Sequence, residues 1–163
     1  MAGTNKLSGI VDKINTLPEF ARSRALTLFF GKVVPFTGTA GIRIESLDHD
    51  RCVIRLVNKR RVQNHIGGVH AVASLLLAES ATGFLVGMNV SDDKVPVIKT
   101  AHAEYTRRAK GDMTVEAYLT AEQRERIRME DKGEVTVPVT IRDSEGKEPI
   151  ELAMIWAWTP KRR

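Results

Sequence analysis

Residues 69–88 have the sequence VHAVASLLLAESATGFLVGM, and this stretch decides the fold. It contains no lysine, arginine or aspartate, and its single acidic residue is Glu79. The helix that it predicts is apolar on nearly every face, and such a helix is either buried in a protein or spans a membrane. About twenty apolar residues suffice for a span, but a charge at the midpoint is expensive in lipid. We therefore predict a buried helix over residues 69–88 and no membrane span.

Strand patterns precede and follow this helix. They lie at residues 39–47, 51–57, 95–106, 113–120, 134–142 and 149–159. The segment Asp143–Gly146 has the composition of a hairpin turn between the last two, and Pro138 predicts an edge strand or a bulge because it lacks an N–H donor. The polar segment 122–132 fits either a helical insert or an extended hairpin tip. Together these patterns predict an α+β fold, with an antiparallel sheet wrapped around one long buried helix.

The first 36 residues are predicted to form a helical arm. Apolar residues recur at helical spacing over residues 7–17. Pro18 suits the first turn of a second helix, and Gly31 is a candidate stop for it. We expect the arm, residues 1–36, to pack on a single main domain, residues 37–163.

Composition limits the class of protein. A chain of 163 residues that is 42% hydrophobic can bury a core, and its single cysteine, Cys52, excludes a disulfide framework or a multi-cysteine zinc site. Residues 1–6 lack the apolar pattern of a signal peptide, so we expect a cytoplasmic protein.

The formal net charge of +5 suits an anionic partner. Basic residues cluster at 59–61, 107–110 and 161–163, without the interleaved aromatic residues of a surface that stacks single-stranded nucleic acid. No recognition helix accompanies these clusters. A solvated face or a site for a phosphate-bearing small molecule is therefore the better interpretation, and we expect no nucleic-acid partner.

A second informative pattern leads into the helix, namely Asn64-His65-Ile66-Gly67-Gly68-Val69-His70. The two glycines allow a tight backbone turn, and the N–H groups at a helix start favour a developing negative charge. Structural interpretations are also open, because glycines turn a chain, asparagine caps helices and histidines often have structural roles.

Glu79 is unusual because it is the lone acid in so apolar a helix. Burial among apolar neighbours would raise its pKa, as expected for a carboxylate that acts as a base near neutral pH. The alternative is a structural ion pair, for example across an oligomer interface.

The loop and helix resemble the hotdog-fold thioesterase superfamily, nearest to the branch of the phenylacetate-pathway acyl-CoA thioesterases. That branch carries Asn-x-x-Gly-x-x-His-Gly-Gly and then an acid in the helix, and the matching residues here are Asn64, Gly67, His70 and Glu79. Ala71-Val72 replaces the final Gly-Gly. The helical arm and the segments 38–42 and 79–83 are similar to less characterised members, which are described as a domain of unknown function.

The resemblance implies hydrolysis of an acyl-CoA or acyl-carrier thioester, with no metal and with coenzyme A only as part of the substrate. Glu79 would be the base or nucleophile acting through water, and Asn64 would orient the water or the carbonyl. The backbone N–H of Ala71 would polarise the thioester oxygen, and His70 would hold the loop in shape. The residues expected around the substrate are Gly67, Gly68, Val72, Leu75 and Leu76.

Basic residues are implied to meet the phosphates of coenzyme A, namely Arg107, Arg108, Lys110, Arg60 and Arg61. The resemblance also implies a homodimer, or a tetramer of such dimers, with active sites at the subunit interface. Some relatives supply a serine or threonine from the partner's strand, at a position that is Ile98 here. This difference and Ala71-Val72 favour an alternative function, a non-catalytic hotdog module that binds acyl-CoA or lipid.

Overall fold

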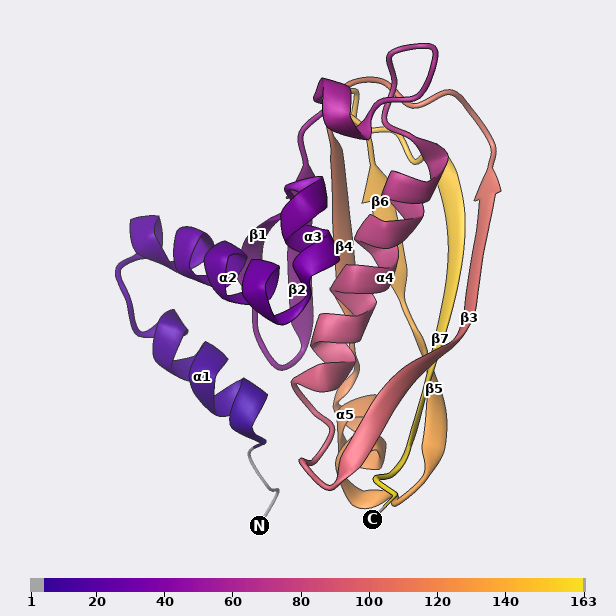
Figure 1. Ribbon diagram of the computed structural model, residues 1–163. Coiled ribbons are helices and arrows are strands. Elements are labelled where there is room, and N and C mark those ends of the chain that lie inside the picture. The colour runs from indigo at the N-terminus through magenta and orange to yellow at the C-terminus, as the bar shows by residue number, and fades with distance from the viewer. Residues whose placement is uncertain (1–4, 163) are drawn as a thin grey trace.

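Helix α4 lies at the centre of the fold, and antiparallel strands curve around it (Figure 1). The computed structural model describes residues 5–162. The helices are α1 Lys6–Asn15, α2 Glu19–Val33, α3 Pro35–Ala40, the 3-10 helix η1 Arg60–Val62, α4 Ala71–Gly87 and α5 Ala121–Met129. The strands are β1 Arg43–Leu47, β2 Arg51–Leu56, β3 Lys94–Tyr105, β4 Met113–Tyr118, β5 Gly133–Val137, β6 Val139–Arg142 and β7 Ile150–Pro160. The predicted α+β fold is confirmed, and none of the helices in residues 5–162 has the length and hydropathy needed to cross a membrane.

Helix α4 covers residues 71–87 of the range 69–88 over which a helix was predicted. Leu77, Ala81 and Leu85 recur every four residues and have no exposed surface. The helix begins where His70 caps it, with Nδ1 accepting a hydrogen bond from the N–H of Val72 at 3.1 Å. Burial is not complete around the helix, however, because Val72 is 58% exposed. One side of the helix is therefore left partly open by the strands.

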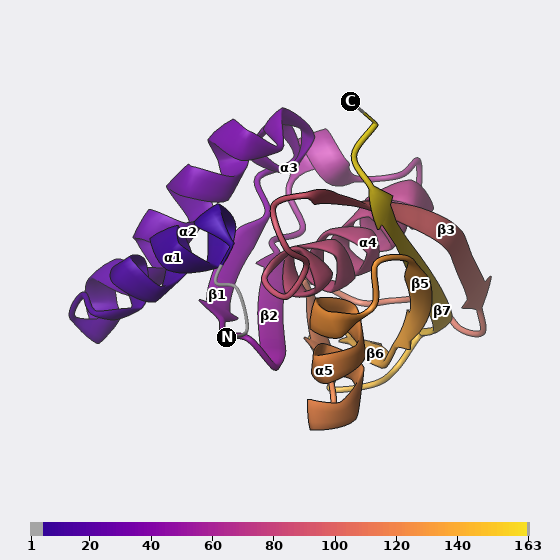
Figure 2. The ribbon, with the colours of Figure 1, turned by 90° about the horizontal axis from the view of Figure 1, so that it is seen from below.

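The division of one predicted strand into β5 and β6 carries the chain from one sheet to the other. One sheet has the order β1-β2-β4-β6 and the other β3-β7-β5. The strand predicted over residues 134–142 is divided at Pro138, which cannot donate to a ladder, into β5 and β6. β5 pairs with β7 while β6 pairs with β4, so the predicted hairpin is formed only by its β5–β7 half. Because β5 and β6 are consecutive, they connect the two sheets around α4 (Figure 2).

The N-terminal arm holds three helices rather than two. α2 continues through Gly31, so the predicted stop there is wrong, and α3 covers Thr39, where a strand was predicted. Gly31 is accommodated within α2 because it packs on Gly38 of α3, where a Cβ atom would lie only 2.9 Å from the carbonyl oxygen of Gly31. α3 ends at Gly41, whose φ of +75° lies in the left-handed region. The boundary expected between residues 36 and 37 falls within α3.

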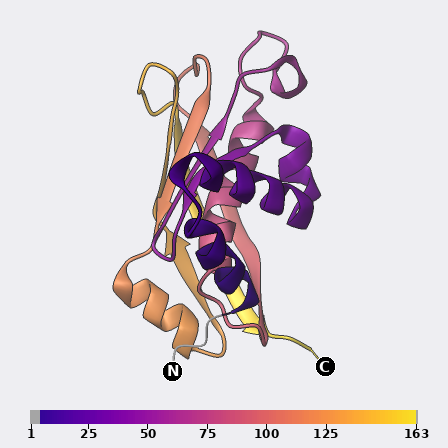
Figure 3. The ribbon, with the colours of Figure 1, turned by 90° about the vertical axis from the view of Figure 1, so that its left-hand side faces the viewer.

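The arm covers one side of the molecule (Figure 3). Ser23 Oγ donates to the carbonyl oxygen of Ile44 in β1 at 2.7 Å, and the N–H of Ile44 donates to Thr27 Oγ1 at 2.9 Å. On the same side of α2, the ring of Phe30 contacts Phe84 of α4 with centroids 4.2 Å apart. α2 is therefore fixed to both a strand and the central helix.

The polar segment 122–132 is largely helical and forms most of α5. Thr120 Oγ1 accepts from the N–H of Gln123 at 3.1 Å, and Gln123 Oε1 accepts from the N–H of Thr120 at 3.0 Å. This reciprocal capping box starts the helix. Ile127 is its buried side chain and anchors α5 to the body.

Candidate functional site at the start of helix α4

A cavity of about 330 Å³ lies in front of the N-terminus of α4. The loop before α4, the first turn of α4 and the loop after β3 form its walls. It brings together five residues that the sequence analysis selected, Asn64, Gly68, Ala71, Arg107 and Arg108. Its other lining residues are Ile66, Val69, Ser74, Tyr105, Ala109 and Ile150. Segments some 40 residues apart in the sequence therefore meet at one site.

Asn64 fixes the shape of the loop. Its Oδ1 accepts hydrogen bonds from the N–H of Ile66 at 3.0 Å and of Gly68 at 3.1 Å. Gly67 between them has a φ of +78°, which favours glycine. Asn64 therefore stabilises the loop and does not cap α4, whose N-cap is His70. The side-chain NH2 group of Asn64, at Nδ2, is the part of this residue that remains available to a ligand.

The start of α4 presents a backbone donor to the cavity. His70 accepts the N–H of Val72, whereas the N–H of Ala71 has no acceptor within residues 5–162. Tyr105 Oη donates to the carbonyl oxygen of Ala71 at 2.6 Å and so ties the end of β3 to this turn. Tyr105 and Ser74 were not among the site residues predicted from the sequence. The place of Tyr105 in the site depends on this contact between segments that are far apart in the sequence.

The β3 strand presents no serine or threonine to α4 near Ile98. Ile98 pairs with Trp156, whose ring lies against Gly83 of α4, and paired residues share a face of a sheet. The register shifts between Ile98 and Thr100, and Thr100 then pairs with Ile155 on the opposite face. Thr100 is therefore no substitute for the hydroxyl that the resemblance leads one to expect.

Glu79 lies farther along α4 and does not line this cavity. It is half-buried, and desolvation raises the pKa of its carboxyl group, partly opposed by a hydrogen bond from Ser80. No ion pair reaches it within the described residues. Leu75 and Leu76 are likewise half-buried, and together with the exposed Val72 they lie outside the cavity. The expected catalytic acid and the expected oxyanion donor are thus in separate places within one chain.

The basic residues divide into two groups. Arg107 and Lys110 both contact Glu145, at 3.3 and 3.0 Å, and Lys110 lowers the pKa of the Glu145 carboxyl group. Arg108 donates to the carbonyl oxygen of Ile66 at 3.3 Å and lies at the cavity wall. Arg60 and Arg61 form the other group. They lie on η1 and do not line this cavity.

The family described as "Domain of unknown function (DUF4442)" matches residues 22–158, which hold α4, the cavity and Glu79. The chain belongs to the DUF4442 family. No curated protein matches the DUF4442 sequence significantly.

Solved structures resemble this DUF4442 chain over most of its length. A protein of unknown function from Pseudomonas aeruginosa, described as a probable thioesterase, is 26% identical with a TM-score of 0.76, covering 89% of this chain and 97% of that one. A mutant thioesterase from the same organism is 19% identical with a TM-score of 0.67 over 82% and 92% of the two chains. A Haemophilus influenzae thioesterase is 16% identical with a TM-score of 0.64 over 89% and 92%. The DUF4442 chain therefore has the hotdog fold of these thioesterases.

Proposed function

We propose that this DUF4442 protein hydrolyses an acyl thioester carried by coenzyme A or by a carrier protein, and that it is nearest in chemistry to the phenylacetate-pathway branch. The observation that carries the proposal is the cavity at the start of α4. There the N–H of Ala71 has no acceptor among the described residues, and two arginines line the same cavity. A helix N-terminus favours the oxyanion that forms when a thioester carbonyl is attacked.

In the proposed reaction water attacks the thioester directly, and no covalent acyl-enzyme intermediate forms. Glu79 removes a proton from water as the oxygen attacks the carbonyl carbon, and the N–H of Ala71 stabilises the oxyanion. The carbon–sulfur bond then breaks, and the leaving thiolate takes the proton. The raised pKa of Glu79 suits a general base. Asn64 orients the water through its amide, and Arg107 and Arg108 meet the phosphates.

This reaction requires a second subunit. Glu79 lies eight residues after Ala71, about 12 Å along the helix axis, and outside the cavity. We propose that two chains pair through their β3 edges, so that Glu79 of the partner subunit approaches the cavity. β3 has β7 as its neighbour within residues 5–162 and leaves Val97 48% and Ile98 38% exposed. An exposed edge strand of this length can pair with another strand. A tetramer of two such dimers is compatible with the same interface.

The interface can be tested by placing a charge on the edge. Val97→Glu should convert the dimer to a monomer and abolish turnover, as measured by light scattering and thiol release. Ile10→Glu changes a residue of α1 that is 42% exposed and should affect neither. A monomeric wild-type protein, or a dimer unchanged by Val97→Glu, would contradict pairing through β3.

A non-catalytic module that binds acyl-CoA or lipid is the second candidate. Two observations favour it: the α4-facing side of β3 carries Ile98 instead of a hydroxyl, and Ala71-Val72 narrows the approach that Gly-Gly leaves open. Such a module would retain the cavity and its arginines without efficient hydrolysis.

Release of free thiol from short, long and aromatic acyl-CoAs tests the two candidates together. We expect turnover of at least one class by the wild-type protein. If no thiol is released while acyl-CoA raises the thermal midpoint, the binding module is favoured, because a ligand that binds the folded state stabilises it. If there is neither turnover nor protection, and acyl-carrier substrates also fail, both candidates are wrong.

A further inference from the structure

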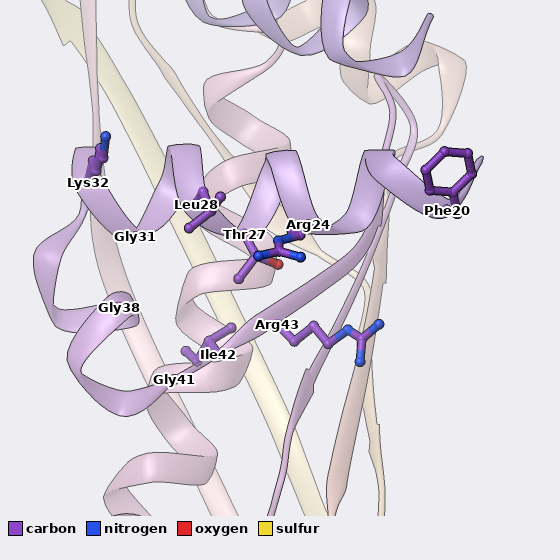
Figure 4. Close-up of a pocket in the computed structure, with 10 residues that line it drawn as sticks. All are labelled: Phe20, Arg24, Thr27, Leu28, Gly31, Lys32, Gly38, Gly41, Ile42 and Arg43. Carbon is purple, nitrogen blue, oxygen red and sulfur yellow. The ribbon is translucent and has the colours of Figure 1, made fainter. Parts of the chain in front are cut away.

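A second cavity, of about 640 Å³, lies between α2, α3 and the start of β1, apart from the candidate active site (Figure 4). Phe20, Arg24, Leu28 and Lys32 recur every four residues along α2, which places them on one side of that helix. Ile42 and Arg43 contribute from the strand side. Apolar and cationic side chains thus alternate along one groove, and no carboxylate is among its lining residues.

The floor of this groove is held by hydrogen bonds and close packing. Ser23 and Thr27 bind both backbone polar groups of Ile44, which fixes α2 against β1. The direct contact of Gly31 with Gly38 brings α3 against α2 without side chains between them. The groove is therefore pre-formed, as ligand sites usually are.

The cations of the groove have few partners of their own. Arg24 and Lys32 make no ion pair or side-chain hydrogen bond within residues 5–162. Arg43 contacts Glu45 at 3.4 Å, with 60% of the arginine side chain exposed. An exposed pair of this kind is weak. The positive charge is therefore available to an anion.

The apolar residues of the groove are exposed to an unusual degree. Phe20 is 88% and Leu28 59% exposed, and Ile42, which lines the same cavity, is buried. Both side chains line the same cavity, and large apolar side chains left in water there suit a ligand with an apolar part. We propose that the groove binds a single-chain amphiphile with an anionic head. Its carboxylate or phosphate lies between Arg24 and Arg43, and its hydrocarbon chain runs from there along Leu28 and Ile42. The inference does not depend on thioester hydrolysis.

Calorimetry below the micelle concentration tests this site with dodecanoate and dodecyl phosphate as probes. We expect one site per chain for at least one of them, and the preference between them identifies the head group. Inorganic phosphate, which lacks the chain, and dodecyl maltoside, which lacks the charge, should bind at least tenfold more weakly. Arg24→Gln should weaken binding about tenfold or more, because hydrogen bonds to charged groups contribute that much.

Three control variants make the result decisive. Lys147→Gln removes the same charge from an exposed turn and should leave the dissociation constant unchanged. Leu28→Gln should weaken binding of the dodecyl probes. Loss of binding in Arg108→Gln but not in Arg24→Gln would place the ligand at the α4 cavity and overturn the proposal. Absence of saturable binding, or a change of oligomeric state in Arg24→Gln and Leu28→Gln that marks the groove as a subunit interface, would also overturn it.

Discussion

Replacing Glu79 by glutamine should lower kcat for thioester hydrolysis by about 10²–10⁴-fold, the usual contribution of a general base. Glutamine has nearly the same shape but cannot accept the proton of the attacking water. The affinity for acyl-CoA should change little, because the proposed base acts on the attacking water and glutamine keeps the shape of the side chain. Steady-state thiol release measures the rate, and calorimetry with an acyl-CoA measures the affinity.

The stability of the same variant separates a catalytic from a structural role. Burial raises the pKa of Glu79, so the folded protein favours the protonated carboxyl group. The stability that this group contributes is therefore present at low pH and lost as the pH rises through its folded pKa. At neutral pH, Glu79→Gln should be at least as stable as the wild type. A clear fall in the thermal midpoint would instead indicate a structural ion pair, and Glu125→Gln on α5 is the exposed control.

The pH profile should follow from the same carboxylate. The base is active only when ionised, so kcat should fall as the pH is lowered through the pKa of Glu79. Since burial raises that pKa, the fall should begin at a higher pH than an ordinary glutamate would give. A profile that is flat through the acidic range would mean that Glu79 is not the base.

The central helix could be predicted because its own composition specifies burial. Between Val69 and Met88 only Glu79 is charged, and strand patterns surround it, so only a sheet wrapped on the helix could cover it. Gly31 illustrates what local sequence leaves open. A glycine near the end of a helical pattern usually ends the helix, but here it allows α3 to contact α2. That contact depends on Gly38, seven residues away.

The candidate site was predictable where its residues are neighbours in sequence. Asn64, Gly68 and Ala71 share one loop and helix start, and the structure places all three around one cavity. Tyr105 was missed as a site residue because its bond to Ala71 joins segments 34 residues apart. The separation of Glu79 from the cavity is also invisible in the sequence, because it depends on which side of α4 the strands leave open.

Trp158→Ala should destabilise the protein by about 3–5 kcal/mol, the usual loss for a large aromatic residue in a core. Trp158 has no exposed surface, and its ring covers Gly133 on the neighbouring strand β5, where a Cβ atom would lie 2.5 Å from the ring. Its Nε1 donates to the carbonyl oxygen of Glu130 at 2.8 Å, which the Nζ of Lys94 also contacts at 2.8 Å. The substitution removes both the filling of the core and one of the hydrogen bonds that hold the C-terminal end of α5.

The expected loss corresponds to a fall of about 6–20 °C in the thermal midpoint for a chain of this size. Trp158→Phe keeps most of the apolar volume and loses the hydrogen bond, so it should cost only about 1–2 kcal/mol. Tyr118→Ala, at a side chain that is 49% exposed, should have a much smaller effect. Urea unfolding of all four proteins at one concentration gives the comparison, because dimerisation would otherwise shift the midpoints. If Trp158→Ala costs no more than Trp158→Phe, the hydrogen bond rather than the packing of the ring joins α5 to the sheet.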